Sequence, residues 1–129
     1  MSPYERLSVR ATPEATVEAL REAIRSRGIT EYAVVDHGRD MAAAGTPGFA
    51  AWTLVFGNPA AGAKLLAHDI AAAVDIPLRL AVVSAETGSE IVLRDMRSLL
   101  SDELAELADA LTEVLRALAA QARDLAQGS

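Results

Sequence analysis

The sequence of 129 residues contains no cysteine. Without thiols the chain can form no disulfide, no zinc site with thiolate ligands and no cysteine nucleophile. Aromatic side chains are also scarce, at 4% of residues, although 51% of all residues are hydrophobic. A core of this composition must be aliphatic and filled by Leu, Val, Ile and Ala. The chain is long enough to bury one such core but not two, so we expect a single domain over residues 1–129.

Lysine is nearly absent as well, because Lys64 is the single one, and the net charge is −6. Binding to the phosphates of nucleic acids or to anionic lipids relies on clustered Lys and Arg, and the sequence has no basic stripe. We therefore expect no nucleic-acid partner and no membrane partner. The sequence has no run of about 20 apolar residues that could cross a bilayer, and its polar start does not resemble a secretion signal. We expect a cytoplasmic protein.

The first third of the chain predicts a strand, a helix and a strand. Apolar and polar residues alternate over Tyr4–Arg10, as in a half-buried strand. Thr12 and Pro13 are typical of a helix start, and Gly28 is typical of a helix end. Glu31–Asp36 then reads as a second strand. Because such a succession commonly forms a right-handed crossover, we expect these two strands to be parallel.

The remaining elements follow from the same patterns. We predict a short helix at His37–Ala44, strands at Trp52–Phe56, Leu78–Ser84 and Glu90–Arg94, and helices at Pro59–Val74 and about 101–127. The loop between the last two strands is short enough for an antiparallel hairpin. The predicted fold class is α+β, with two layers, about five strands in a mixed but mainly antiparallel sheet, and helices on one face. The element order is β-α-β-(short α)-β-α-β-β-α.

The C-terminal helix carries the strongest periodic signal. Apolar residues step by four and three from Leu100 to Leu125, and Ser101 is positioned to cap the helix. Such a helix would be about 39 Å long at 1.5 Å per residue, whereas a strand commonly spans about 17–20 Å. The apolar seam can pack on the helix's own sheet or on a second copy of the chain. We predict a homodimer.

A strand-to-helix joint at Phe56-Gly57-Asn58-Pro59 is the main candidate for a binding site. Gly57 permits an unusual φ, Asn58 is a good N-cap, and Pro59 suits the first helical position. Gly62 leaves the first turn with little side-chain bulk. Free amide groups at a helix N-terminus can bind an anion, so we predict that Phe56, Gly57, Asn58 and Gly62 bind a small molecule or an anion. Capping by itself also explains each of these residues.

An Asp36-His37 pair follows the second predicted strand. A carboxylate beside an imidazole can orient it for acid–base catalysis, so these two residues are the catalytic candidates. In the alternative, Asp36 caps the following helix and His37 is a surface or packing residue. No nucleophile or metal-ligand set accompanies the pair, and the second histidine, His68, has no supporting spacing. We therefore expect no metal and no cofactor, and we favour a protein that is not an enzyme.

Three blocks of the sequence occur together at a specific spacing. They are Asp36-His37 with Gly45, then Leu54–Gly62 with its Phe-Gly-Asn-Pro, then Ala71–Arg79 with its Asp-Ile-Pro-Leu. Over about residues 17–95 the chain resembles the family called domain of unknown function 302 (DUF302). The resemblance implies a compact α/β domain that forms homodimers, and it implies no established activity.

Two positions depart from the pattern of that family. Ala63 stands where a hydroxyl residue is usual, and Pro47–Ala51 replaces a polar stretch before the third strand. A ligand of the family that used these positions would not be bound in the same way here.

Three functions are therefore open. The one we favour is a homodimeric domain that binds a small ligand at the joint or serves as an accessory protein. The second is an enzyme that uses Asp36 and His37 near the helix N-terminus at Asn58. The third is a structural or protein-interaction module that acts through the C-terminal helix.

Overall fold

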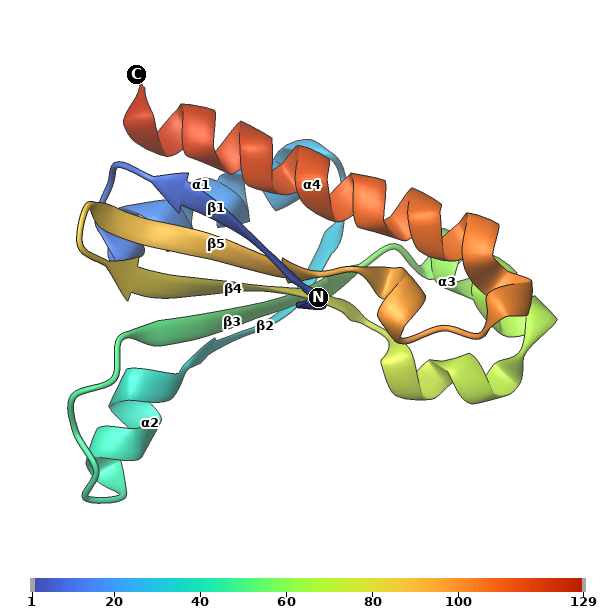
Figure 1. The fold of residues 1–129 in the computed structure, drawn as a ribbon, viewed down its shortest axis with the longest axis horizontal. Helices are drawn as coiled ribbons and strands as arrows, with labels where there is room; N and C mark the ends of the chain where they lie inside the picture. The colour runs from blue at the N-terminus through green and yellow to red at the C-terminus, as the bar shows by residue number, and fades with distance from the viewer. Residues whose placement is uncertain (1, 129) are drawn as a thin grey trace.

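The computed structural model describes residues 2–128 and contains one five-stranded sheet in the order β1-β5-β4-β3-β2 (Figure 1). The strands are β1 (Tyr4–Val9), β2 (Thr30–Asp36), β3 (Ala51–Gly57), β4 (Leu78–Ala85) and β5 (Gly88–Arg94). The α-helices are α1 (Pro13–Ser26), α2 (His37–Ala43), α3 (Pro59–His68) and α4 (Ala105–Gln127). Short 3₁₀ helices are η1 (Ile70–Asp75), η2 (Met96–Ser98) and η3 (Asp102–Leu104). The predicted α+β class and the predicted order of the main elements are confirmed.

The predicted parallel pair of strands is wrong. Every strand pair in residues 2–128 is antiparallel, and β1 and β2 lie at opposite edges of the sheet. The partner of β1 is β5, with Leu7 opposite Ile91 and Val9 opposite Ser89. This pairing joins the first and the last strand of the chain, which local periodicity does not reveal. The sheet is therefore antiparallel and not mixed.

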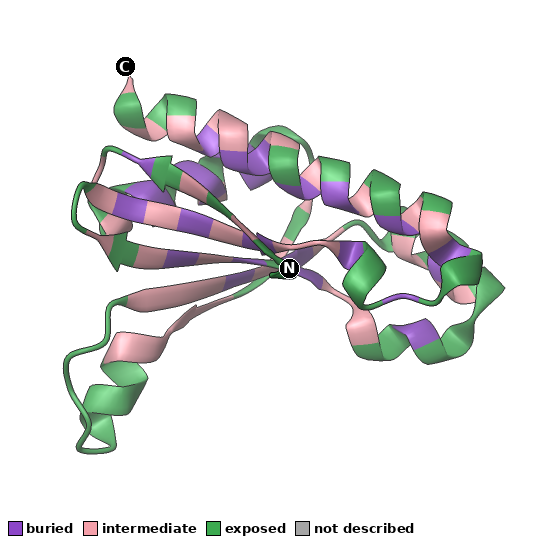
Figure 2. Cartoon of the chain, viewed as in Figure 1, coloured by how far each residue is buried: buried purple, intermediate pink, exposed green. Residues whose placement is uncertain are grey.

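One face of the sheet carries the core. Alternate residues of the three central strands are buried there, as the period of two requires. They are Leu54 and Phe56 of β3, Leu78, Leu80 and Val82 of β4, and Ile91 and Leu93 of β5. Helices α1 and α4 cover this face and contact each other (Figure 2). Residues on the other face, such as Thr53, Ala81 and Val92, stay partly exposed to solvent.

The predicted helix over 59–74 is interrupted. Helix α3 ends at His68, because Asp69 has an extended backbone with φ −155°. The Asp69 carboxylate then accepts a hydrogen bond from the Ala71 amide at 3.0 Å and starts η1. Short acidic side chains compete for backbone amides in this way and favour a new cap over continuation of a helix.

The apolar seam of α4 is buried or partly buried within the chain except at Leu125, which is exposed. Ala108, Leu115, Leu118, Ala119 and Ala122 are buried in the same core as α1 and the sheet. The α-helix begins at Ala105 after η3, and the Ser101 side chain makes no capping hydrogen bond within the described residues. The seam therefore finds its partner inside the chain, so it no longer requires a second copy.

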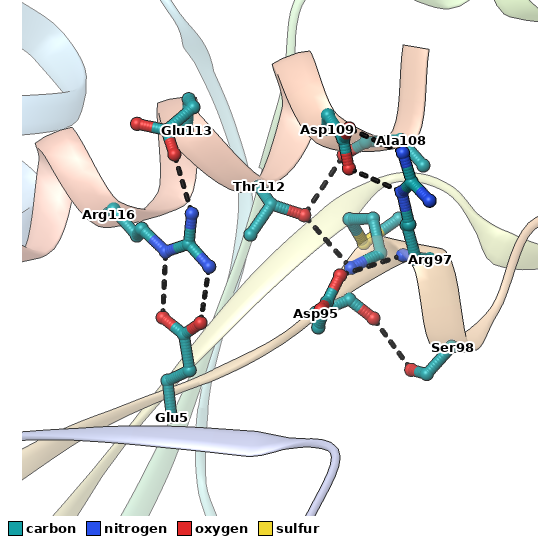
Figure 3. A network of polar contacts seen from close by, with 10 residues as sticks. Glu5, Asp95, Arg97, Ser98, Ala108, Asp109, Thr112, Glu113 and Arg116 are labelled. Atoms are coloured by element: carbon teal, nitrogen blue, oxygen red, sulfur yellow. Dashed lines mark hydrogen bonds and ion pairs between the residues drawn. The ribbon is translucent and has the colours of Figure 1, made fainter. Parts of the chain in front are cut away.

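Two ion pairs attach α4 to other elements, one to β1 and one to η2 (Figure 3). Arg116 of α4 donates two hydrogen bonds to the carboxylate of Glu5 on β1, one of them 2.8 Å from Nε to Oε2. This contact lowers the pKa of Glu5. Arg97 donates to both carboxylate oxygens of Asp109 at 2.7 and 2.8 Å. All four side chains are partly exposed to water, so these pairs orient the helix more than they stabilise the fold.

A buried hydroxyl makes a third connection to α4. Thr112 Oγ1 accepts a hydrogen bond from the Met96 amide at 3.0 Å and donates one to the Ala108 carbonyl at 2.9 Å (Figure 3). Thr112 is 2% exposed. Both its donor and its acceptor capacities are used, so the polar group adds no unsatisfied atom to the core.

Candidate functional site

A pocket of about 570 Å³ lies beside the joint between β3 and α3. All four residues predicted to bind a ligand, Phe56, Gly57, Asn58 and Gly62, line it. The structure therefore brings the predicted binding residues together around one concave space.

The walls of this joint pocket come from segments that are distant in the sequence. Ile29 and Tyr32 approach from β2 and the loop before it, and Ile76 approaches from the loop after η1. Leu111 and Val114 of α4 complete the enclosure. Sequence reasoning missed these residues. The only signal for the last two was the apolar seam of α4, which does not distinguish a core position from a pocket wall.

Asn58 caps α3 as predicted. Asn58 Oδ1 accepts hydrogen bonds from the amides of Ala60 at 3.0 Å and Ala61 at 3.4 Å. Pro59 has no amide hydrogen, and the Gly62 amide donates to the Asn58 carbonyl at 2.9 Å. The expectation of free amides is therefore wrong. Asn58 occupies the amide groups of this first turn, and they are not available to an anion.

Gly57 and Gly62 matter through their lack of a side chain. Gly57 does not have the unusual φ that we expected, because it is not among the glycines with positive φ. A Cβ on Gly57 would instead lie 3.3 Å from Cε2 of the Tyr32 ring. A Cβ on Gly62 would meet only Ile76 Cδ1, at 3.7 Å. Small residues at these two positions keep the pocket open.

The chemistry of the joint pocket is mostly apolar. Leucine, isoleucine, valine, proline and alanine side chains dominate its lining, and Phe56 is fully buried at its base. The groups with polar atoms are Arg27, Tyr32 and Asn58. Arg27 Nε donates to Gln121 Oε1 at 2.8 Å. An apolar lining with a few polar groups is typical of pockets for small organic ligands.

The catalytic candidates Asp36 and His37 lie elsewhere. Asp36 pairs with Trp52 at one end of β3, whereas Asn58 follows the other end. Six residues of extended chain separate Trp52 from Asn58, which is about 20 Å. Neither Asp36 nor His37 lines the joint pocket. The structure does not bring these candidates together with the helix N-terminus.

Each member of the Asp-His pair has a structural role. Asp36 Oδ1 accepts a hydrogen bond from the Arg39 amide at 2.9 Å and caps α2. His37 Nε2 forms a 2.7 Å hydrogen bond with Thr53 Oγ1 on the neighbouring strand. The pair thus fixes the turn from β2 into α2.

Two features are absent from residues 2–128. Within them no three His, Asp or Glu side chains are grouped so that they could hold a metal ion. Over the same residues, no helix combines the length and the apolar character needed to span a bilayer.

Comparison with known proteins identifies the family. The family model described as "Domain of unknown function DUF302" matches residues 5–124. The crystal structure of an uncharacterised conserved DUF302 protein from Bacillus stearothermophilus has a TM-score of 0.88 and 18% sequence identity, covering 95% of this chain and 100% of the other. None of the curated proteins matches this chain significantly. With nearly its whole length matched by the family model, and with the same fold as a solved DUF302 protein, the chain belongs to the DUF302 family.

Proposed function

We propose that the protein is a cytoplasmic accessory domain that binds a small, largely apolar molecule in the joint pocket. The observation that carries this proposal is the apolar enclosure of about 570 Å³ around Phe56, Gly57, Asn58 and Gly62. Pockets for small organic ligands typically measure about 300–1,000 Å³ and bury most of the ligand surface. Binding is favoured over catalysis because the lining contains no acid–base pair, and its one cationic side chain is Arg27.

The occupied amides at the start of α3 favour an apolar ligand over an anion. A helix N-terminus attracts anions through amide groups that have no other partner. Here Asn58 already accepts from Ala60 and Ala61. The ligand we propose is therefore held by burial of apolar surface, with Arg27, Tyr32 and Asn58 as the available polar contacts.

Filling the pocket from Gly62 tests this proposal. We expect the uncharged dye N-phenyl-1-naphthylamine to bind the wild-type protein, and we expect Gly62→Phe to weaken binding at least tenfold, because the new ring would occupy the pocket. Gly62→Ala is the matched control, since its Cβ would meet Ile76 at an ordinary 3.7 Å. Fluorescence titration measures both. Equal affinity of wild-type and Gly62→Phe protein would contradict the proposal, provided that circular dichroism shows both to be folded.

We also propose that the protein is a homodimer, and that it assembles through the arm formed by α2 and the loop after it. Helix α2 has no buried residue and projects away from the sheet (Figure 1). Met41 on this helix is 38% exposed, and Phe49 in the loop is 55% exposed. A helix of seven residues is too short to be stable by itself, so contact with a second copy would support it.

Sedimentation velocity tests the assembly. We expect wild-type protein to sediment as a dimer and the double variant Met41→Glu, Phe49→Glu to sediment as a monomer. Leu125→Glu is the control, because Leu125 is a comparably exposed apolar residue, at 44%, but lies on α4. A monomeric wild-type protein would refute dimerisation, and a dimeric double variant would refute the arm as its site.

A further inference from the structure

A second concavity opens at the end of the sheet where β4 and β5 part, and it shares Pro77 and Leu78 with the joint pocket. Its volume is about 450 Å³, and Tyr4, Arg79, Ala81, Val92 and Arg94 are among its lining residues. These residues belong to β1, β4 and β5. The lining also includes Leu115 of α4 and the core residue Leu80, so the concavity runs between the strands from the face opposite α1 and α4 toward the core. We call it the sheet cleft.

The strand pairing explains why a cleft forms here. The ladder between β4 and β5 runs from the hairpin turn and ends at the pair Ala81 and Val92. Beyond this pair, β4 continues in register with β3, and β5 continues in register with β1. Because β4 and β5 are not paired beyond Ala81 and Val92, the two strands separate at this end of the sheet. The cleft therefore reaches the core residues Leu80 and Leu93.

Two arginines line this opening, one on each of the parting strands. Arg79 lies two residues beyond Ala81 on β4, and Arg94 lies two residues beyond Val92 on β5, so both belong to the open face. Both line the sheet cleft. Among residues 2–128, neither forms an ion pair with a carboxylate. Like charges on neighbouring strands are destabilising, and an anion between them would remove that repulsion.

Arg94 is held in place by an aromatic ring. Its guanidinium carbon lies 5.1 Å from the centre of the Tyr4 ring, and its Nη2 donates to Tyr4 Oη at 3.3 Å. A stacked guanidinium keeps its other N–H groups available, and it loses less conformational entropy when it binds an anion. One carboxylate, Asp75, also lines the cleft, which leaves an excess of one positive charge in a chain of net charge −6.

We propose that the sheet cleft binds a small organic anion, with its carboxylate or phosphate group between Arg79 and Arg94. Guanidinium groups bind both kinds of anion through paired hydrogen bonds. Ala81 and Val92 provide a small apolar floor for the body of the ligand. This site is independent of the joint pocket, because the residues that hold the anion line only the sheet cleft.

Isothermal titration calorimetry with phenyl phosphate at low salt tests the site. We expect saturable binding by wild-type protein, and at least tenfold weaker binding by Arg79→Gln, by Arg94→Gln and by the double variant. Arg25→Gln on α1 should bind like wild-type protein, because Arg25 lies outside the cleft. Asp75→Asn should bind more tightly, since it removes the one negative charge from the lining. This gain would not arise from a purely structural role of the cleft.

Further ligands identify what is recognised. Benzoate should compete with phenyl phosphate if the site accepts both anions, and failure to compete would assign it to phosphates. Neutral benzyl alcohol should not bind. Unchanged affinity in the folded double variant, or equal binding of benzyl alcohol, would overturn the proposal. Gly62→Phe should leave phenyl phosphate binding unchanged, so the fate of this site can be separated from that of the joint pocket.

Discussion

Replacing Phe56 with alanine is expected to lower the free energy of unfolding by about 3–5 kcal/mol, the usual range for a buried phenylalanine. Phe56 is fully buried and is one of only two phenylalanines in the chain. Its ring lies in the core beside Leu78 on the paired strand and also forms the base of the joint pocket. All other buried core residues are non-aromatic, so truncation of Phe56 leaves a cavity that they can close only in part. A loss of this size is a large fraction of the stability of an ordinary domain, about 5–15 kcal/mol.

Urea unfolding followed by circular dichroism measures this loss. Phe56→Leu is the matched control, because it keeps an apolar side chain at the site and should cost less than half as much as Phe56→Ala. The same loss in both variants would show that the ring itself, and not the volume it fills, stabilises the core. A loss below about 1 kcal/mol for Phe56→Ala would contradict the central position that we assign to this residue.

Replacing Gly88 with alanine is the second change with a large expected effect. Gly88 follows the hairpin turn with φ +137°, and an added Cβ would lie 2.6 Å from the carbonyl oxygens of both Val9 and Ala11. These are backbone atoms at the end of β1, so the clash is relieved only if β1 moves away from β5. We expect the free energy of unfolding to fall by more than about 2 kcal/mol, because holding a residue with a Cβ at such a φ by itself costs about 1–3 kcal/mol.

The displacement would also break a buried polar contact. Ser89 Oγ lies 3.0 Å from the Ala11 carbonyl and 2.7 Å from Thr16 Oγ1, and both hydroxyl residues are buried. Gly28→Ala is the control, since Gly28 has φ +68° but nothing within 4 Å of the added Cβ. The Gly28→Ala variant should lose stability only through the cost of its positive φ, because its Cβ meets no other atom. Equal losses at Gly28 and Gly88, measured by urea unfolding, would show that the contact of β1 with the hairpin is not tight.

Much of the local structure was predictable from short stretches of sequence. Asp36 and Asn58 cap the helices that follow them, and the strands of the hairpin pair as expected. Capping and tight turns depend on a few adjacent residues whose side chains reach their own backbone. For the same reason the sequence motifs were sufficient to recognise the DUF302 family, which the family model confirms.

The candidate site was predictable only in part. Phe56, Asn58 and the two nearby glycines were found because they form one continuous motif, and they do line one pocket. The opposite wall from α4 was not foreseen, and the free amides expected at the joint are occupied by Asn58. A pocket depends on which distant surfaces meet, and a motif describes only one of them.

What the sequence determined by itself was therefore the main strands and helices, their order, the caps at Thr12, Asp36 and Asn58, and the family. The tertiary structure decided the rest: β1 beside β5, most of the α4 seam packed against α1 and the sheet, and the two concavities that meet at Pro77 and Leu78. The physical reason is that all apolar faces of the chain compete for burial. Which strands pair, and which surface covers the seam, therefore depends on the whole chain. A periodic pattern indicates that a face must be buried, but only the folded chain determines which surface covers it.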